Sequence, residues 1–208
     1  MIRVNSVLLE RLMVLKACGP GRCLGFDEPG TAHRPGGRDR DGEQGLQYAF
    51  VEGEPLWKES QGPEKRSEPF AASDFCEISP QYTDHDTNRG TPQIILGNED
   101  CLYLNIWRPK SREDKLPVYF WIHGGGNSVQ WPLLSWLDGS ILANRSKMIV
   151  VSANYGLGPM GWFSHPALRT GQKGDEKTDS GNFGTLGLIK ALSWVQGNIK
   201  AFGGDPPM

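Results

Sequence analysis

The stretch VYFWIHGGGNSV (residues 118–129) joins five apolar residues to a histidine and three glycines. The β-branched and aromatic run at its start is typical of a strand that is covered on both faces. Glycine loses more backbone entropy on folding than other residues do. A glycine triplet directly after a buried strand therefore indicates a loop whose bare backbone N–H groups face another group.

Two apolar runs, LPVYFWI (116–122) and KMIVVSANY (147–155), predict strands of the same buried type. Between them lies PLLSWLDGSILANR (132–145), which has the length of one crossover and favours a partly helical structure. Two buried strands joined in this way predict a parallel, right-handed βαβ unit. The class indicated is therefore α/β.

A third strand is predicted within residues 94–107, where Leu102, Leu104 and Ile106 share one face and Tyr103 and Trp107 share the other. The segment 182–202 predicts a helix, because apolar residues recur in it at helical spacing. These are Leu188, Ala191, Leu192, Val195 and Ile199. Asn182 or Thr185 is expected to cap the start. Gly203 and Gly204, followed by Pro206, are expected to end the helix.

Composition narrows the function classes. The 208 residues carry Lys+Arg 22 against Asp+Glu 24, a net charge of −2, which gives no electrostatic case for nucleic acid or an anionic membrane. No window approaches the roughly 18 apolar residues of a membrane span.

Residues 19–69 are rich in Gly, Pro and charge and predict loop or disorder. Charged residues interrupt the apolar N-terminus (1–18), which argues against an export signal, and no compartment is assigned.

The glycine triplet itself allows several interpretations. Neither G-x-x-x-x-G-K-[ST] nor G-x-G-x-x-G is present, so a nucleotide-phosphate loop is weakly supported. A purely structural turn is an open alternative. The preceding His123 favours a third interpretation, because a strand that ends in HGGG is the loop with which α/β-hydrolase esterases present backbone N–H donors to a developing oxyanion.

Four segments together resemble one family, the type-B carboxylesterases related to the cholinesterases. They are EDCLYLNIWRP (99–109), LPVYFWIHGGGN (116–127), VVSANYGLGPMGW (150–162) and the segment 180–206. The resemblance implies the N-terminal part of an α/β-hydrolase fold, with an incomplete central sheet. It extends over residues 45–208 and leaves residues 1–44 unplaced, as a region expected to be disordered or loop-rich.

By this resemblance the amides of Gly125 and Gly126 are oxyanion-hole donors, and His123 and Gly124 support the loop. The substrate class implied is a small-molecule ester, with no cofactor and no metal. None of the family's catalytic triad is identified, because no G-x-S-x-G motif occurs in the sequence. Ser128 does not lie in such a motif, and neither His123 nor the other three histidines (His33, His85 and His165) occupies the place of the catalytic base.

The sequence also departs from the family pattern. Gly156 stands where the family has an arginine, and Gly187 stands where it has an acidic residue. Ser79 occupies the place of a cysteine that usually pairs with the one matching Cys101. Because Cys76 lies three residues earlier, a Cys76–Cys101 disulfide is a possible substitute, and it would stabilise the fold by roughly 3 kcal/mol.

These observations predict a member of the carboxylic ester hydrolases. Its sequence ends before the G-x-S-x-G turn that carries the nucleophilic serine (the nucleophile elbow), so the isolated chain is expected to be inactive. Exposed strand edges would make such a chain prone to aggregation. Two alternatives stay open. One is a non-catalytic, cholinesterase-like binding or adhesion protein, and the other is a small-molecule binding module that uses the glycine loop for anions.

Overall fold

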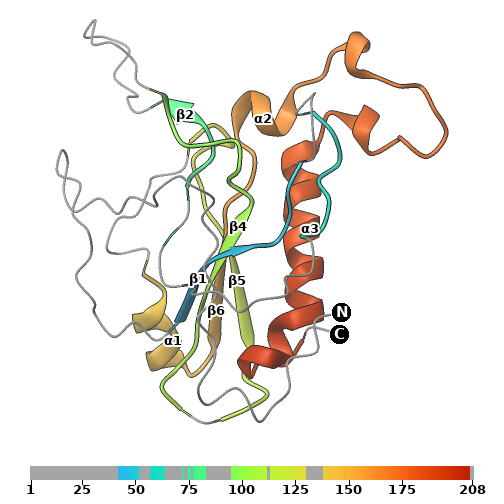
Figure 1. Cartoon of the computed structure of the whole chain (residues 1–208). Coiled ribbons are helices and arrows are strands. Elements are labelled where there is room, and N and C mark those ends of the chain that lie inside the picture. Colours follow the sequence, from blue (N-terminus) through green and yellow to red (C-terminus); the bar gives the residue numbers. More distant parts are fainter. Residues whose placement is uncertain are drawn as a thin grey trace, which may run out of the picture.

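The computed structural model describes residues 42–51, 57–63, 77–82, 95–111, 113–129 and 138–206, together with residues 72 and 75. Its centre is a four-stranded sheet in the order β1-β4-β6-β5 (Figure 1). The strands are β1 (Gly42–Gln47), β4 (Tyr103–Trp107), β5 (Val118–Ile122) and β6 (Ile149–Ala153). β4 runs antiparallel to both β1 and β6.

The predicted βαβ unit is confirmed. β5 and β6 pair in parallel, and α1 (Ser140–Ser146) lies in the connection between them. All five side chains of β6 are buried, as expected of a strand covered on both faces. The α/β class inferred from the two apolar runs is therefore the observed one.

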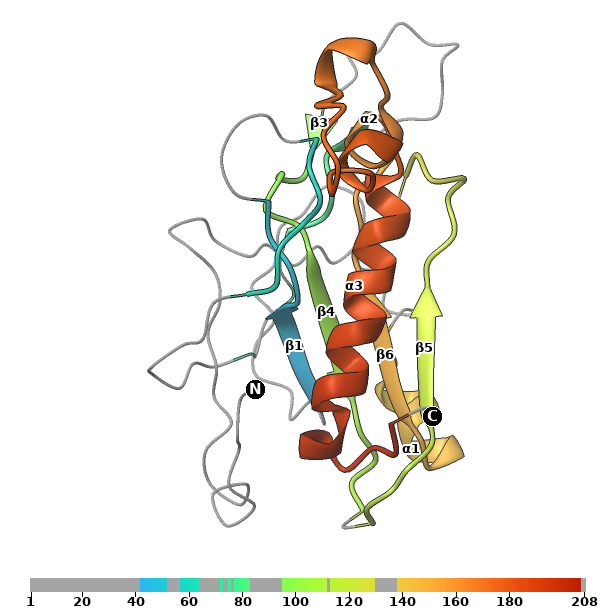
Figure 2. The ribbon, with the colours of Figure 1, turned by 90° about the vertical axis from the view of Figure 1, so that its right-hand side faces the viewer.

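Helices cover the sheet on two sides. α3 (Phe183–Asn198) packs on one face, and α1 lies behind the opposite face (Figure 2). The larger core joins the α3 side chains Ala191 and Val195 to alternating residues of β4 and β6, such as Leu104 and Val151. A smaller core beside α1 contains Trp107, Ala143 and Val150. The two faces predicted for residues 102–107 are thus confirmed: Leu104 and Ile106 of β4 belong to the larger core, and Trp107 belongs to the smaller one.

The helix predicted over 182–202 is confirmed with two differences. α3 begins after Asn182, but the side chain of this residue makes no capping hydrogen bond. Leu192, expected on the buried face, is 44% exposed. The end agrees with the prediction, because a 3-10 turn (Ile199–Phe202) leads into Gly203, whose φ of 81° is left-handed.

The prediction of loop for residues 19–69 was wrong at β1. Its sequence, GEQGLQ, contains no β-branched or aromatic residue, so the strand depends on pairing with β4. Its register shifts at Gly45, whose N–H donates to Asn105 Oδ1 at 3.0 Å. Phe50 and Gln61 form a further antiparallel bridge in this region.

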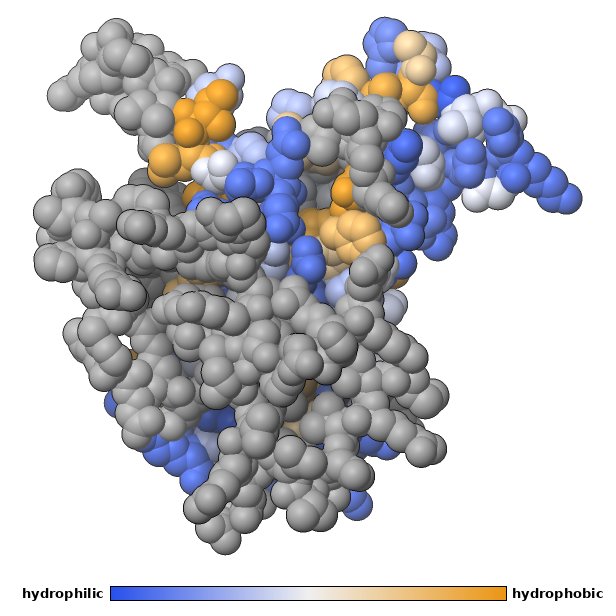
Figure 3. Space-filling model, in the orientation of Figure 1, coloured by the Kyte–Doolittle hydropathy of each residue, from blue (hydrophilic) through white to orange (hydrophobic). Residues whose placement is uncertain are grey.

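The strand predicted within 94–107 is also divided. Ile95–Leu96 forms a short strand, β3, that pairs with β2 (Gln81–Tyr82) rather than continuing into β4. Figure 3 shows hydrophobic surface over this small ladder, where Ile95 is 63% exposed.

β5 lies at the edge of the sheet (Figure 2). Within the described part of the chain it pairs only with β6, and Tyr119 and Ile122 are nearly half exposed. The prediction that this strand is covered on both faces was therefore wrong, since none of its five side chains is buried. On α3, Ile189 is 53% exposed. Apolar side chains are therefore open to solvent on the last strand of the sheet and on the covering helix.

Two glycines of α3 give opposite expectations for substitution. A Cβ on Gly184 would lie 2.5 Å from the Trp162 ring and 2.8 Å from the Gly156 carbonyl, because α2 (Gly158–Trp162) packs closely there. Gly184→Ala is expected to lower the free energy of unfolding by about 1–3 kcal/mol through this overpacking. Urea denaturation of the purified protein measures the change.

Gly197→Ala is the matched control, since a Cβ at that position meets nothing within 4 Å. Alanine favours the helix over glycine by up to about 1 kcal/mol, so this variant is expected to be more stable than the wild type. Equal effects of the two substitutions would contradict the packing described for α2 and α3.

Candidate active site

The glycine loop begins where β5 ends. His123 is buried, whereas Gly124, Gly125 and Gly126 are exposed. Gly125 has a φ of 118°, and a Cβ there would collide with the backbone of Val129. Glycine is therefore required at this position by the turn itself. Gly124 and Gly126 have open space around them, so their missing side chains leave bare backbone at the surface.

Each carbonyl of this segment is held by a partner within the protein. The Tyr155 hydroxyl donates to the His123 carbonyl at 3.0 Å. His123 Nδ1 lies 2.9 Å from the Gly124 carbonyl. The Gly125 carbonyl accepts from the N–H groups of Ser128 and Val129 at 3.1 and 3.2 Å.

The amide N–H groups of the three glycines have no acceptor within the described residues. In a trans peptide the N–H points away from the carbonyl of the same unit. Each of the three N–H groups therefore points away from the partner that holds the carbonyl of its own peptide unit, and the three glycines themselves are exposed. Successive free N–H groups of this kind suit an anionic oxygen.

His123 is held in a neutral form. Because a carbonyl only accepts hydrogen bonds, Nδ1 must carry the proton that it shares with Gly124. Burial lowers the pKa of His123, and the hydrogen bond to Gly124 opposes this only in part. Its ring stacks on Tyr155 with centroids 4.4 Å apart, and Nε2 is buried without a partner in the described structure.

The serine and the histidines that the sequence analysis rejected as triad members form no triad within the described residues. The Ser128 hydroxyl donates to the Gly126 carbonyl at 3.2 Å. His165 is exposed and accepts from the Ala167 N–H. His33 and His85 lie outside the described residues. Sequence reasoning placed His123, Gly124, Gly125 and Gly126 in one loop, as found, but missed Tyr155, whose contact arises only from strand pairing.

Cys101 is a free, buried thiol. The disulfide predicted with Cys76 is not formed in this structure, and Cys76 itself lies outside the described residues. Instead Cys101 hydrogen-bonds the side chain of Ser79. Ser79 is fully buried, and its hydroxyl also accepts from the Leu157 N–H at 3.0 Å. The serine thus lies beside the cysteine, in the place where the resemblance put a second cysteine.

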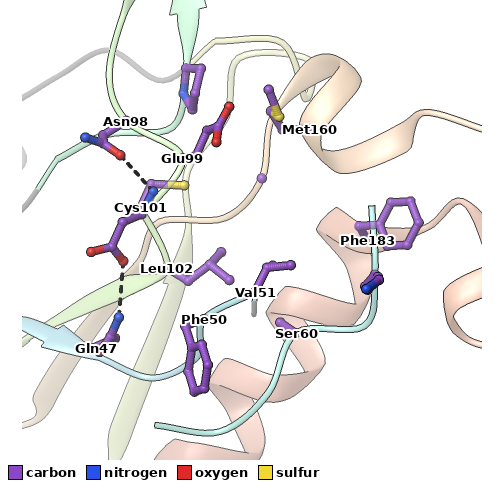
Figure 4. A pocket seen from close by; sticks show the side chains of 14 residues that line it. Gln47, Phe50, Val51, Ser60, Asn98, Glu99, Cys101, Leu102, Met160 and Phe183 are labelled. Atoms are coloured by element: carbon purple, nitrogen blue, oxygen red, sulfur yellow. Dashed lines mark hydrogen bonds between the residues drawn. The ribbon is translucent and has the colours of Figure 1, made fainter. Parts of the chain in front are cut away.

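A cavity of about 740 Å³ lies beside this pair, between the β1–β4 side of the sheet and the two helices α2 and α3. Figure 4 shows Met160 and Phe183 on one side and Glu99 and Cys101 on the other. Gly156 also lines it. At this position, where the resemblance predicts an arginine, no side chain extends into the space.

Comparison with known proteins assigns the family. The model of the Carboxylesterase family matches residues 44–208. The chain belongs to this family. Among curated relatives, it is 46% identical to the fumonisin B1 esterase of Sphingopyxis macrogoltabida over 110 residues, which are 52% of this chain and 20% of that protein. It is 35% identical to the para-nitrobenzyl esterase of Bacillus subtilis over 164 residues, 78% of this chain and 32% of that protein.

Solved structures agree with this membership. A PNB esterase aligns with a TM-score of 0.66 at 33% identity, covering 88% of this chain and 34% of the other. A carboxylesterase of Geobacillus stearothermophilus aligns with a TM-score of 0.63 at 32% identity, covering 79% and 32%. The carboxylesterase chain thus has part of an α/β-hydrolase fold. It spans between a fifth and about a third of the length of these relatives.

The described residues offer neither a metal-binding cluster nor a membrane-spanning helix. In the described part of the carboxylesterase chain, no cluster of three or more His, Cys, Asp or Glu side chains has the arrangement to hold a metal ion. None of the described helices combines the length and apolarity that crossing a membrane requires.

The buried thiol predicts a loss of stability at alkaline pH. Burial, the largest cause, raises the pKa of Cys101 from 9.0 to about 12. The unfolded chain releases this proton above pH 9, whereas the folded chain retains it, so stability falls as the pH rises from 9 to 12. Between pH 8 and 10 the expected loss due to Cys101 is about 1.4 kcal/mol.

Cys101→Ala is the control for this titration. Burial also raises the pKa of Tyr48 well above its usual range, and that contribution stays in the variant. Urea denaturation at pH 8 and pH 10 is expected to show a smaller loss for the variant than for the wild type. The same loss in both proteins would disprove the assignment to Cys101.

Proposed function

We propose that this chain supplies the oxyanion-binding part of a serine esterase that hydrolyses carboxylic esters. The proposal rests mainly on the three exposed N–H groups of Gly124, Gly125 and Gly126, which have no acceptor in the described structure. When a nucleophile attacks an ester, negative charge develops on the carbonyl oxygen. Fixed N–H dipoles stabilise that charge without reorganising. Gly125 and Gly126 are the donors proposed for it.

Family membership supports the same chemistry. Serine esterases use a serine nucleophile in a G-x-S-x-G elbow and a histidine base. The 208 residues contain no such elbow. We therefore propose that these residues bind and polarise a small-molecule ester and that by themselves they do not cleave it.

His123 does not substitute for the missing base. Its Nδ1 is engaged with Gly124, and its Nε2 is buried. A general base must come within hydrogen-bonding distance of the proton that it removes. The Ser128 hydroxyl is bonded to the Gly126 carbonyl, and it has no such base as its partner among the described residues.

A chimera tests the proposed function. Residues 44–208 replace the matching segment of the Bacillus subtilis para-nitrobenzyl esterase, to which this chain is 35% identical. The folded chimera is expected to hydrolyse p-nitrophenyl acetate. Gly125→Ala, which disturbs the turn, is expected to lower kcat by about 10²–10³-fold, the usual cost of a lost oxyanion donor. The initial rate of p-nitrophenol release measures both.

Gly197→Ala in the same chimera is the control, because that position is exposed and lies on α3. The 208-residue chain alone is expected to show no hydrolysis above buffer and no labelling by a fluorophosphonate. Covalent labelling of the chain would contradict the proposal. A chimera that unfolds cooperatively but lacks activity would instead favour the alternative of a non-catalytic, cholinesterase-like binding protein.

A further inference from the structure

The direction of the glycine amides depends on two neighbouring aromatic residues. In the His123–Gly124 peptide the carbonyl accepts from the Tyr155 hydroxyl, and the N–H has no acceptor within the described residues. The Gly124–Gly125 peptide contributes its carbonyl to His123 Nδ1, and its N–H is likewise free. Because the two groups of a peptide unit point in opposite directions, the partner of each carbonyl determines where each N–H points.

Tyr155 contacts this segment in two ways. Its hydroxyl holds the His123 carbonyl, and its ring stacks on the imidazole at 4.4 Å with an interplanar angle of 22°. The stacked ring limits rotation of the imidazole, so Nδ1 stays directed at the Gly124 carbonyl. Trp162 also contacts Tyr155, edge-on, with ring centroids 6.1 Å apart. The tyrosine is itself buried, with 2% of its surface exposed.

We propose that Tyr155 is a positioning residue, which acts through His123 to fix the directions of the Gly124 and Gly125 N–H groups. The importance of these directions for ester hydrolysis rests on the proposed function. The positioning itself is a property of the folded chain. Tyr155 touches no reacting atom, and its effect passes through one carbonyl and one imidazole.

The two aromatic side chains differ from ordinary core residues because each one bonds a carbonyl that has no partner in the turn. The Gly125 carbonyl is held by the turn, through Ser128 and Val129, and needs no aromatic residue. The two preceding carbonyls have no such turn partner, and each takes its hydrogen bond from an aromatic side chain. Loss of Tyr155 is therefore expected to release the first two N–H groups but not that of Gly126.

Nuclear magnetic resonance of the ¹⁵N-labelled 208-residue protein tests the positioning directly. Residual dipolar couplings report the direction of each N–H bond. Tyr155→Phe, which keeps the ring, is expected to change the coupling of Gly124. Tyr155→Leu, which removes the ring as well, is expected to change the couplings of Gly124 and Gly125, with that of Gly126 retained.

Tyr103→Phe is the matched control. It removes a hydroxyl that bonds Asp100 at 2.7 Å, and Tyr103 lies on β4, which β6 separates from β5. All three glycine couplings are expected to keep their wild-type values in this variant. The ¹⁵N shifts of His123 in the wild type are expected to show the proton on Nδ1. A proton on Nε2, or wild-type glycine couplings in Tyr155→Leu, would overturn the proposal.

A titration with dimethylphosphinate, a tetrahedral monoanion, separates this inference from the proposed function. The wild type is expected to show saturable shifts of the Gly125 and Gly126 amides. In Tyr155→Phe the Kd is expected to rise about fivefold, as for one lost hydrogen bond, and in Tyr103→Phe it is expected to stay the same. Absence of shifts in the wild type would overturn the oxyanion role, while the couplings would still decide the role of Tyr155.

Discussion

The parallel pairing of β5 with β6 is the constraint on which the rest of the structure depends. The pairing aligns Ile122 with Ala153, so both strands end at the same edge of the sheet. The residues that follow the two strands therefore lie side by side: His123 after β5, and Asn154 and Tyr155 after β6. An antiparallel pair would place the end of one strand beside the start of the other. The stacking of the imidazole on the phenol, and with it the shape of the glycine loop, follows from this alignment.

Main-chain donors make this site unusually dependent on its surroundings. A side-chain donor is directed by its own rotamer, but a backbone N–H is directed by the peptide plane, which has no rotamer of its own. Its direction is fixed at the carbonyl end of the same plane. This explains why buried groups such as Tyr155 and the turn at Val129 matter for a surface that they do not reach. It also explains Gly124 and Gly126, since side chains at these positions would cover the amides, whereas Gly125 is required by the turn itself.

The sequence predicts a strand or helix well where the residues of that element alone carry its pattern, and poorly where the element depends on a distant partner. β6 and α3 carry their own signals, because a continuous apolar run and helical spacing reflect burial that these elements need individually. The apolar run of β5 located the strand but not its exposure, since none of its five side chains is buried. β1 was missed because GEQGLQ has no β propensity and becomes a strand only through β4. The HGGG motif located the glycine loop, yet Tyr155 lies 32 residues from His123, and no local pattern encodes their contact. The same limit applies to Ser79 and Cys101, whose contact was anticipated only through resemblance to the family.

The neutral state of the two aromatic groups is what makes their arrangement suitable for an oxyanion site. Burial lowers the pKa of His123 and raises the pKa of Tyr155, so both groups stay uncharged around neutral pH. An uncharged imidazole with its proton on Nδ1 remains a donor to Gly124, while an uncharged phenol remains a donor to the carbonyl of His123. Neither group then offers a competing charge to the glycine amides. The desolvation that prevents His123 from acting as a base is thus the same effect that keeps it a fixed structural donor.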